Sequence, residues 1–264
     1  HTYMNGQTPH PCVMCNIHVK FPCLLDFADS VGARLAATGH YARIGESGGT
    51  YYVRRAADTR KDQSYMLWGL DPATLSRVRF PLGELTKPQI REIAASAGLP
   101  CASTPDSQDI CFIPDGDFRG YLDRALGESP RGSFIDADGN VLGSHMGQRN
   151  FTIGQSRGLG IALGRRMYVL RRDAAKNEVT LGDEAELFRR EVRAAGIRLN
   201  WDFPADTRFS VNIRYSQAMY QASVTQTGED EITVVFDEPV RAPAPGQSMV
   251  LYDGDTLVGG GIIA

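Results

Sequence analysis

The chain has 264 residues, a formal net charge of −3 and five cysteines. This length predicts two or three domains, and the slightly negative charge excludes an overall positive field, so that any nucleic-acid contact must come from local basic patches. The sequence shows no run of about 18 apolar residues and no secretory leader, which predicts a cytoplasmic protein without a membrane span.

The cysteines are candidates for catalysis or metal binding. An odd number of them without a signal peptide is typical of a reducing compartment, where cysteines serve catalysis or metals more often than structural disulfides. Cys12 and Cys15 form a Cys-x-x-Cys pair, and Cys111 follows a polar, turn-rich stretch, so all three are candidate reactive thiols. The pair alone also fits an incidental pair or half of a zinc site. Cys23 and Cys101 have apolar neighbours, and we expect them in the core.

The first part of the chain is predicted to mix helices and strands. Apolar residues at three- and four-residue spacing predict a helix over 21–31. Residues 34–41 are typical of a buried parallel strand that ends at Gly39 and His40, and ligands of open α/β sheets bind at such carboxyl ends. Residues 51–55 follow a Gly-Gly turn and predict a hairpin arm.

Helix signals continue downstream. Residues 64–70 and 71–78 are predicted to be helical, the second with an Asp-Pro start. Thr86 begins another helix with a capping pattern, and Gly98 ends it. The segment 21–126 is therefore predicted to be mixed α/β.

The composition changes near residue 128. Residues 133–190 carry many glycines among short apolar pairs, which indicates small, turn-rich structure. From about residue 191, β-like runs alternate with turn residues at the spacing of an all-β barrel. These runs are 209–215, 220–224, 232–236, 249–252 and 260–263. We expect an α/β domain at 1–127, a small connector domain at 128–190 and a β-barrel domain at 191–264.

Long, irregular motifs along nearly the whole chain resemble one family. They are TPHPCVMCN, HVKF, LAATGHYARI, KDQSYMLWGL, FPLGELTKPQIREIA, PDSQDICFIPDGDFRGYL, FTIGQSRGLGI, FDEPVRAPAPGQSMVLYDGD and GGGII. In this order they are similar to the tRNA-specific 2-thiouridylase family (MnmA/TrmU type). The resemblance implies part of a Rossmann-like α/β domain of the adenine nucleotide alpha hydrolase type, a small mixed connector and a C-terminal β-barrel. It also implies an enzyme that replaces the 2-oxygen of the wobble uridine of tRNA with sulfur.

The resemblance assigns roles to two cysteines. ATP, with Mg, adenylates the uridine oxygen in this family; Cys111 matches the cysteine that carries the persulfide, and Cys15 matches a second cysteine that closes a disulfide. Elementary chemistry agrees, because sulfur transfer needs a soft anionic nucleophile and a second thiolate, and adenylation makes the oxygen a leaving group. The implied partners are the tRNA anticodon arm and a persulfide-donating sulfur carrier or cysteine desulfurase.

Binding residues also follow from the resemblance. Gly39 matches a glycine at the ATP, and the residues that match tRNA contacts are His10, Pro11, Cys12, His40, Lys61, Asp62, Gln63, Arg214, Tyr215 and Gln247. Arginine on phosphate and tyrosine stacked on an unpaired base are typical of single-stranded loop recognition. Without the resemblance, these positions are equally typical of a strand end, a solvated loop and a barrel rim. We expect a structural turn, with tRNA contact left open, at Gly154, Gln155, Arg157, Gly158, Leu159 and Gly160.

Two departures from the family pattern leave alternatives open. The SGGVDS-type phosphate-binding loop does not occur, so we expect either a piece of a longer protein or an activation half that resides elsewhere. The chain alone would then be a non-catalytic tRNA-binding fragment. Cys12 replaces an aspartate that many members carry, and with Cys15 and Cys111 it supplies three ligands for a 4Fe–4S cluster, as in cluster-dependent tRNA thiolases.

Overall fold

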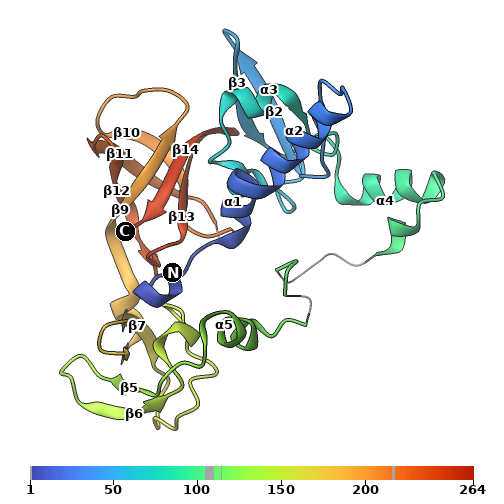
Figure 1. Cartoon of the computed structure of the whole chain (residues 1–264). Coiled ribbons are helices and arrows are strands. Elements are labelled where there is room, and N and C mark those ends of the chain that lie inside the picture. The colour runs from blue at the N-terminus through green and yellow to red at the C-terminus, as the bar shows by residue number, and fades with distance from the viewer. Residues whose placement is uncertain (1, 105–109, 114, 216–217) are drawn as a thin grey trace.

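The computed structural model describes residues 2–104, 110–113, 115–215 and 218–264 (Figure 1). A helical run opens the chain after a short 3-10 turn, η1 (Thr2–Asn5). It consists of α1 (Pro11–Cys15), the π-helical turn η2 (Asn16–Lys20) and α2 (Phe21–Ser30). The helix predicted over 21–31 is thus confirmed, and it continues a helix that starts ten residues earlier.

A minimal parallel sheet follows the helical run. Strand β1 (Ala36–Ala37) pairs in parallel with β4 (Val78–Arg79), and the connection between them contains η3 (Ser64–Leu67) and α3 (Pro72–Arg77). A parallel strand ending before Gly39 is confirmed, although it is much shorter than the predicted 34–41. Asp71 caps α3 by accepting the Thr74 N–H, as the Asp-Pro start predicted.

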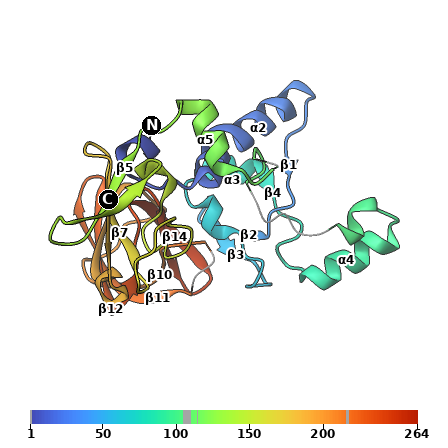
Figure 2. The same ribbon diagram turned by 90° about the horizontal axis from the view of Figure 1, so that it is seen from below.

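We call residues 2–104 the first part of the chain. Within it, helix α4 (Lys87–Ser96) lies apart from the other elements in both views (Figures 1 and 2). Thr86 and Gln89 form the expected capping box, and Gly98 adopts a left-handed backbone with φ of +67° after the helix end. The 3-10 turn η4 (Pro100–Ser103) and helix α5 (Phe118–Leu126) follow. None of the helices in the described ranges is long and apolar enough to cross a bilayer.

The middle of the chain forms a small sheet with the strand order β6-β5-β8-β7. Its strands are β5 (Gly132–Ile135), β6 (Val141–His145), β7 (Tyr168–Asp173) and β8 (Glu178–Gly182), and the 3-10 turns are η5 (Gln148–Asn150) and η6 (Glu184–Leu187). Phe134, Val169 and Leu181 are fully buried in its own core. The glycine-rich stretch is therefore small and turn-rich, as predicted.

Six strands close a C-terminal barrel. They are β9 (Phe188–Leu199), β10 (Thr207–Asn212), β11 (Tyr220–Gly228), β12 (Glu231–Arg241), β13 (Ser248–Asp253) and β14 (Thr256–Ile263). They pair in the order β13-β10-β11-β12-β9-β14, and the β13–β14 pairing closes the ring. The five predicted β-runs coincide with strands of the barrel, although the run predicted over 209–215 ends at Asn212, and the long strand β9 joins them.

The first part is built onto the barrel. The hairpin of β2 (Ala42–Ser47) and β3 (Thr50–Arg55) extends the barrel sheet through the register pair Thr256↔Arg54. One core cluster contains Phe21 and Leu67 from the first part together with Tyr252 from β13. This shared core fixes the N-terminal helical run against the barrel. The domain boundaries proposed at 127/128 and 190/191 stay predictions.

Two expectations about burial are wrong. Helix α2 buries the face of Phe21 and Ala28, whereas Phe27 is 65% exposed. Cys23 is two residues after Phe21, about 200° around the helix, so it lies on the exposed face with Phe27 and not in the core. Cys101, in the 3-10 turn η4, is also exposed.

Candidate functional site

The segment that leads into α1 is held on two sides. The Thr8 N–H donates to the Pro245 carbonyl at 2.8 Å, and the Gln247 amide donates to the Thr8 carbonyl at 2.8 Å. From the middle sheet, the Arg172 guanidinium donates to the Gly6 carbonyl at 2.7 Å and to Thr8 Oγ1 at 2.8 Å. Burial lowers the pKa of Arg172 to about 10. Gln247, a predicted tRNA contact, thus anchors the site segment from the barrel.

His10 and Pro11 stand at the start of α1. Pro11 occupies the first helical turn, where its missing N–H costs nothing. The His10 ring packs edge-on against Tyr65 with 5.6 Å between centroids, and burial lowers its pKa. Within the described ranges its buried Nδ1 has no hydrogen-bond partner. A neutral imidazole with an unsatisfied nitrogen beside the cysteines suits a polar ligand.

The structure brings the three candidate thiols into one electrostatic neighbourhood. Cys12 and Cys15 lie half-buried at the two ends of α1, and Cys111 is exposed. Burial raises the pKa of the Cys12 thiol most, and the nearby charges of Cys111 and Cys15 raise it further. The Lys20 ammonium lowers the same pKa. Residues about a hundred positions apart in sequence are therefore near enough to influence one another electrostatically around α1.

All five cysteines are free thiols in this structure. In the described part of the chain, no three His, Cys, Asp or Glu side chains are arranged so that they could hold a metal ion. The arrangement of Cys12, Cys15 and Cys111 therefore does not fit a 4Fe–4S cluster as it stands.

His40 is buried at the carboxyl end of β1. Its ring stacks on Phe21, with 5.5 Å between centroids and 28° between planes. Lys20 Nζ lies 3.5 Å from His40 Nε2, and Thr38 Oγ1 lies 2.7 Å from Nδ1. Because an ammonium can only donate, Nε2 accepts and the Nδ1–H donates to Thr38. Burial, followed by the Lys20 charge, lowers the pKa of His40 to about 4.

Sequence reasoning missed Lys20. It is the last residue of the π-helical turn, eight residues after Cys12. In a regular α-helix, eight residues leave two side chains about 80° apart, whereas an α-turn followed by a π-turn of about 4.4 residues returns to the same face. The π-turn thus places the Lys20 ammonium on the Cys12 face. The available signal was the lone lysine of the HVKF motif, but the sequence does not show the π-turn.

Gly39 is exposed and borders a surface cavity of about 320 Å³. Tyr41, Lys87 and Arg91 also line this cavity. A Cβ on Gly39 would lie 3.6 Å from Leu82 Cδ1 in ordinary contact, so a larger side chain would extend into the cavity. Two cations beside an open glycine fit a phosphate-bearing ligand, and the nucleotide role of Gly39 stays a prediction.

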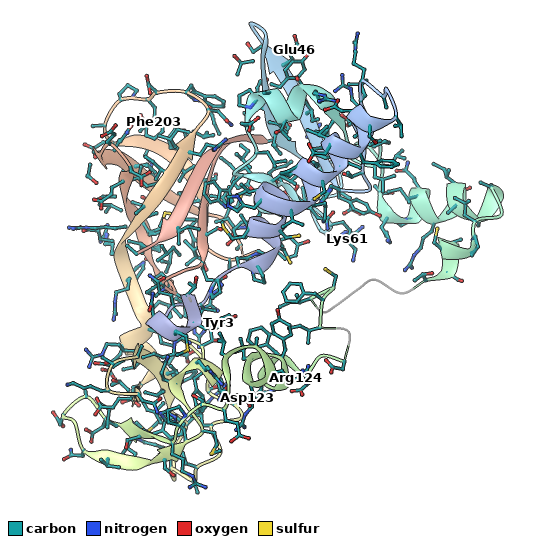
Figure 3. The ribbon with its side chains drawn as sticks, viewed as in Figure 1. Tyr3, Glu46, Lys61, Asp123, Arg124 and Phe203 are labelled. Atoms are coloured by element: carbon teal, nitrogen blue, oxygen red, sulfur yellow. The ribbon has the colours of Figure 1, made fainter. Side chains whose placement is uncertain are left out.

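The residues of the Lys61-Asp62-Gln63 loop have different roles. The Asp62 carboxylate accepts hydrogen bonds from the backbone and hydroxyl of Ser64 and from its ion-pair partner Arg55. Gln63 is joined to Tyr41 in both directions, through its backbone N–H and its side-chain carbonyl. Asp62 and Gln63 thereby hold the loop, while Lys61 lies at the edge that faces α4 (Figure 3).

On the barrel side, Arg214 makes structural hydrogen bonds, whereas Tyr215 is exposed. The half-buried Arg214 donates to the carbonyls of Ile153 and Ala242 at 3.1 and 2.8 Å, which joins the connector to the barrel. Tyr215 is 39% exposed, and its ring centroid lies 6.1 Å from that of Tyr65. Burial, then the charges of Asp62 and Cys12, raise its pKa. Through Tyr65, which also contacts His10, Tyr215 lies near the start of α1.

The connector turn is bound within the middle part. The Gly154 N–H donates to the Val169 carbonyl at 2.8 Å, and the Gln155 amide oxygen accepts from the Thr152 N–H at 3.0 Å. Leu159 is buried in the core of the middle sheet. These contacts support the structural role expected for 154–160.

Comparison with known proteins matches all three parts. Residues 1–115 match the tRNA methyl transferase HUP domain, residues 119–183 the tRNA methyl transferase PRC-barrel domain and residues 189–263 the aminomethyltransferase beta-barrel domain. The chain is 45% identical to the tRNA-specific 2-thiouridylase MnmA of Koribacter versatilis and 43% identical to that of Carboxydothermus hydrogenoformans. Each alignment covers 99% of this chain and 73% of the relative.

Proposed function

Because the chain belongs to the tRNA-specific 2-thiouridylase family, we propose that it transfers persulfide sulfur to C2 of the wobble uridine of tRNA. The observation that carries this proposal is that Cys12 and Cys15 lie together on α1, with Cys111 near enough to act electrostatically on Cys12. The donor thiol must reach the substrate carbon and the second thiol must then reach the sulfur of the donor, and separate sites would not serve this chemistry. We place the reaction in the cytoplasm.

The proposed transfer uses two thiols in sequence. The terminal sulfur of a persulfide on Cys111 forms a bond to C2 of the uridine while the C2–O bond breaks. ATP, when bound, supplies the adenylyl group that makes this oxygen a leaving group. The Cys15 thiolate then attacks the Cys111 sulfur, and the electron pair of the broken S–S bond stays on the sulfur attached to C2. The resulting Cys15–Cys111 disulfide is returned to two thiols by an external thiol reductant.

The surrounding residues prepare this chemistry. The Lys20 ammonium, positioned by the neutral His40, supplies a fixed positive charge beside the thiols. Tyr215 and His10 offer an aromatic face and an unsatisfied nitrogen for the target base. The exposed position of Cys111 suits delivery of sulfur by a carrier protein or a cysteine desulfurase. The tRNA anticodon arm is the proposed nucleic-acid partner.

A cysteine variant series tests the proposal. The chain is incubated with tRNA, ATP-Mg and a persulfide donor, and 2-thiouridine is measured in the digested tRNA. We expect Cys111→Ser and Cys15→Ser to lower product at least 1,000-fold, because each removes a group that makes or breaks a bond. Cys23→Ser, an exposed cysteine on the far face of α2, is the matched control and keeps full activity. Product from Cys111→Ser, or tRNA binding by the wild type without product, would contradict the proposal.

The alternative expected from the sequence is a cluster-dependent thiolase with Cys12, Cys15 and Cys111 as ligands, which their arrangement in the described structure does not favour. The same series separates the two mechanisms. Under the persulfide mechanism, Cys12→Ser lowers the amount of 2-thiouridine only slightly. Under the cluster mechanism, anaerobically purified protein absorbs in the charge-transfer region, and Cys12→Ser abolishes both absorbance and product.

A further inference from the structure

A basic patch lies beside the candidate site at the start of α4. It consists of Arg60, Lys61, Lys87 and Arg91, and we call it the α4 patch. These four side chains border a surface cavity of about 460 Å³ together with Asp58 and Pro88. Four cations surround a single carboxylate there, although the chain as a whole carries a net charge of −3. The local field is therefore positive on a protein whose overall field is not.

The single carboxylate in the patch, Asp58, has a structural role. Asp58 is buried, and it accepts hydrogen bonds from the Lys87 N–H at 3.2 Å and from Arg60 Nε at 3.3 Å. It thereby fastens the loop that carries Arg60 and Lys61 to the first turn of α4. The cations are thus brought together by a buried contact before any ligand arrives, which lowers the entropic cost of binding.

The α4 patch is continuous with the candidate site. Lys87 and Arg91 also line the cavity at Gly39, and the Lys87 ammonium lies 5.6 Å from the ring centroid of Tyr41. The chain has only four lysines, and three of them are found here: Lys20 contacts His40, and Lys61 and Lys87 belong to the patch. Lysine ammonium groups bind phosphate as point charges on flexible stems.

We propose that Arg60, Lys87 and Arg91 extend the tRNA contact predicted for Lys61, so that the α4 patch binds the sugar–phosphate backbone of the tRNA next to the target nucleotide. This inference rests on the proposed function. The patch reaches from the Gly39 cavity across Lys87 and Arg91 to Arg60 and Lys61, on a second element. Such a strip follows a run of successive phosphates better than the compact phosphates of one nucleotide. Backbone contacts of this kind position an RNA without reading its sequence.

The test measures tRNA affinity as a function of salt. The full chain carrying Lys87→Gln and Arg91→Gln is compared with the wild type by fluorescence anisotropy of labelled tRNA. Each lost phosphate contact lowers the slope of log K against log salt by about 0.7 to 0.9. The double variant is therefore expected to lose about 1.4 to 1.8 of slope and at least about 25-fold in affinity at 0.1 M salt. The matched control, Lys176→Gln with Arg190→Gln, removes the same charges elsewhere and keeps the wild-type slope.

The outcomes separate the inference from the function on which it rests. A reduced slope in the double variant only, with an unchanged melting temperature, supports the patch as a backbone site. An unchanged slope overturns it and leaves the proposed function intact. A loss of ATP affinity in equilibrium dialysis, without a change in the tRNA slope, assigns the cations to the nucleotide and also overturns it. Failure of the wild-type chain to bind tRNA would overturn both proposals.

Discussion

His40 shows how one side chain in the site is controlled by its surroundings. Burial under Phe21 and the neighbouring Lys20 ammonium lower its pKa to about 4. A histidine in an unfolded chain has a pKa near 6.5, so between about pH 6.5 and pH 4 the unfolded chain binds more protons than the folded one. The contribution of His40 to folding is therefore complete above about pH 6.5 and is lost as the pH falls toward 4.

This difference predicts a pH-dependent stability. The free energy of unfolding should fall by up to about 1.4 kcal/mol per pH unit below pH 6.5 because of His40, on the order of 3 kcal/mol in total. Urea unfolding at pH 7 and pH 4.5 measures this fall, and His40→Gln should show a smaller one. His10 and His145, whose pKa values are also lowered by burial, remain in both proteins and cancel in the comparison. Equal falls in the two proteins would refute the assignment to His40.

At the residue scale, the sequence suggests candidate reactive groups more readily than the residues that support them. Cys15 and Cys111 are proposed through their motifs, because these cysteines stand in irregular, recognisable stretches. Lys20 and Arg172 were not found, because their roles depend on a π-turn and on a contact across more than 160 residues. Asp62 holds its own loop, a role that the sequence does not show, and its contact with tRNA stays a prediction.

At the element scale, the segment before α1 depends on a strand of the middle sheet. Arg172 on β7 donates to the carbonyls of Gly6 and Phe151 and to Thr8 Oγ1. Substituting methionine leaves three acceptors without their donor, and hydrogen bonds from a charged group are worth about 1.5–3 kcal/mol each before relaxation. The connection therefore makes the position of the cysteine helix sensitive to a distant strand.

We predict that Arg172→Met lowers the free energy of unfolding by about 3 kcal/mol and speeds hydrogen exchange in peptides covering residues 2–16. The control is Arg171→Met, which changes the neighbouring arginine, whose side chain is exposed on the same strand. It should leave the free energy of unfolding within about 0.5 kcal/mol of the wild type and the exchange rate of residues 2–16 unchanged. Equal exchange rates in Arg172→Met and the control would show that the segment is held without this contact.

Local sequence signals predicted where helices begin and end better than they predicted which face of a helix is buried. The cap at Thr86 and the stop at Gly98 were found because they depend on neighbouring backbone groups. The strand predicted over 34–41 forms only at Ala36–Ala37, because strand length is set by its partner β4, which has two residues. Likewise, the buried face of α2 is chosen by what packs against it, and the apolar spacing alone does not select it.

At the scale of the whole molecule, the first part and the barrel form one supporting structure. Tyr65 donates its hydroxyl to the Ser248 carbonyl at 2.8 Å, and Trp68 Nε1 donates to Ser248 Oγ at 2.9 Å. Asp255, between β13 and β14, pairs with Arg43 and Arg54 of the hairpin. The fold class was predictable from the alternation of patterns along the chain, whereas these pairings across about 200 residues were not.

The same architecture sets the central claim to be tested, that sulfur passes from Cys111 to the tRNA base. The chain is charged with a ³⁴S-labelled persulfide, separated from the donor, and mixed with tRNA and ATP-Mg for a single turnover. Mass spectrometry then follows the label on cysteine peptides and in 2-thiouridine. The account predicts that the label leaves the Cys111 peptide as it appears in the base in equal amount, and that a Cys15–Cys111 disulfide forms. Label retained on Cys111 while unlabelled 2-thiouridine accumulates, or label carried by a different cysteine, would contradict it.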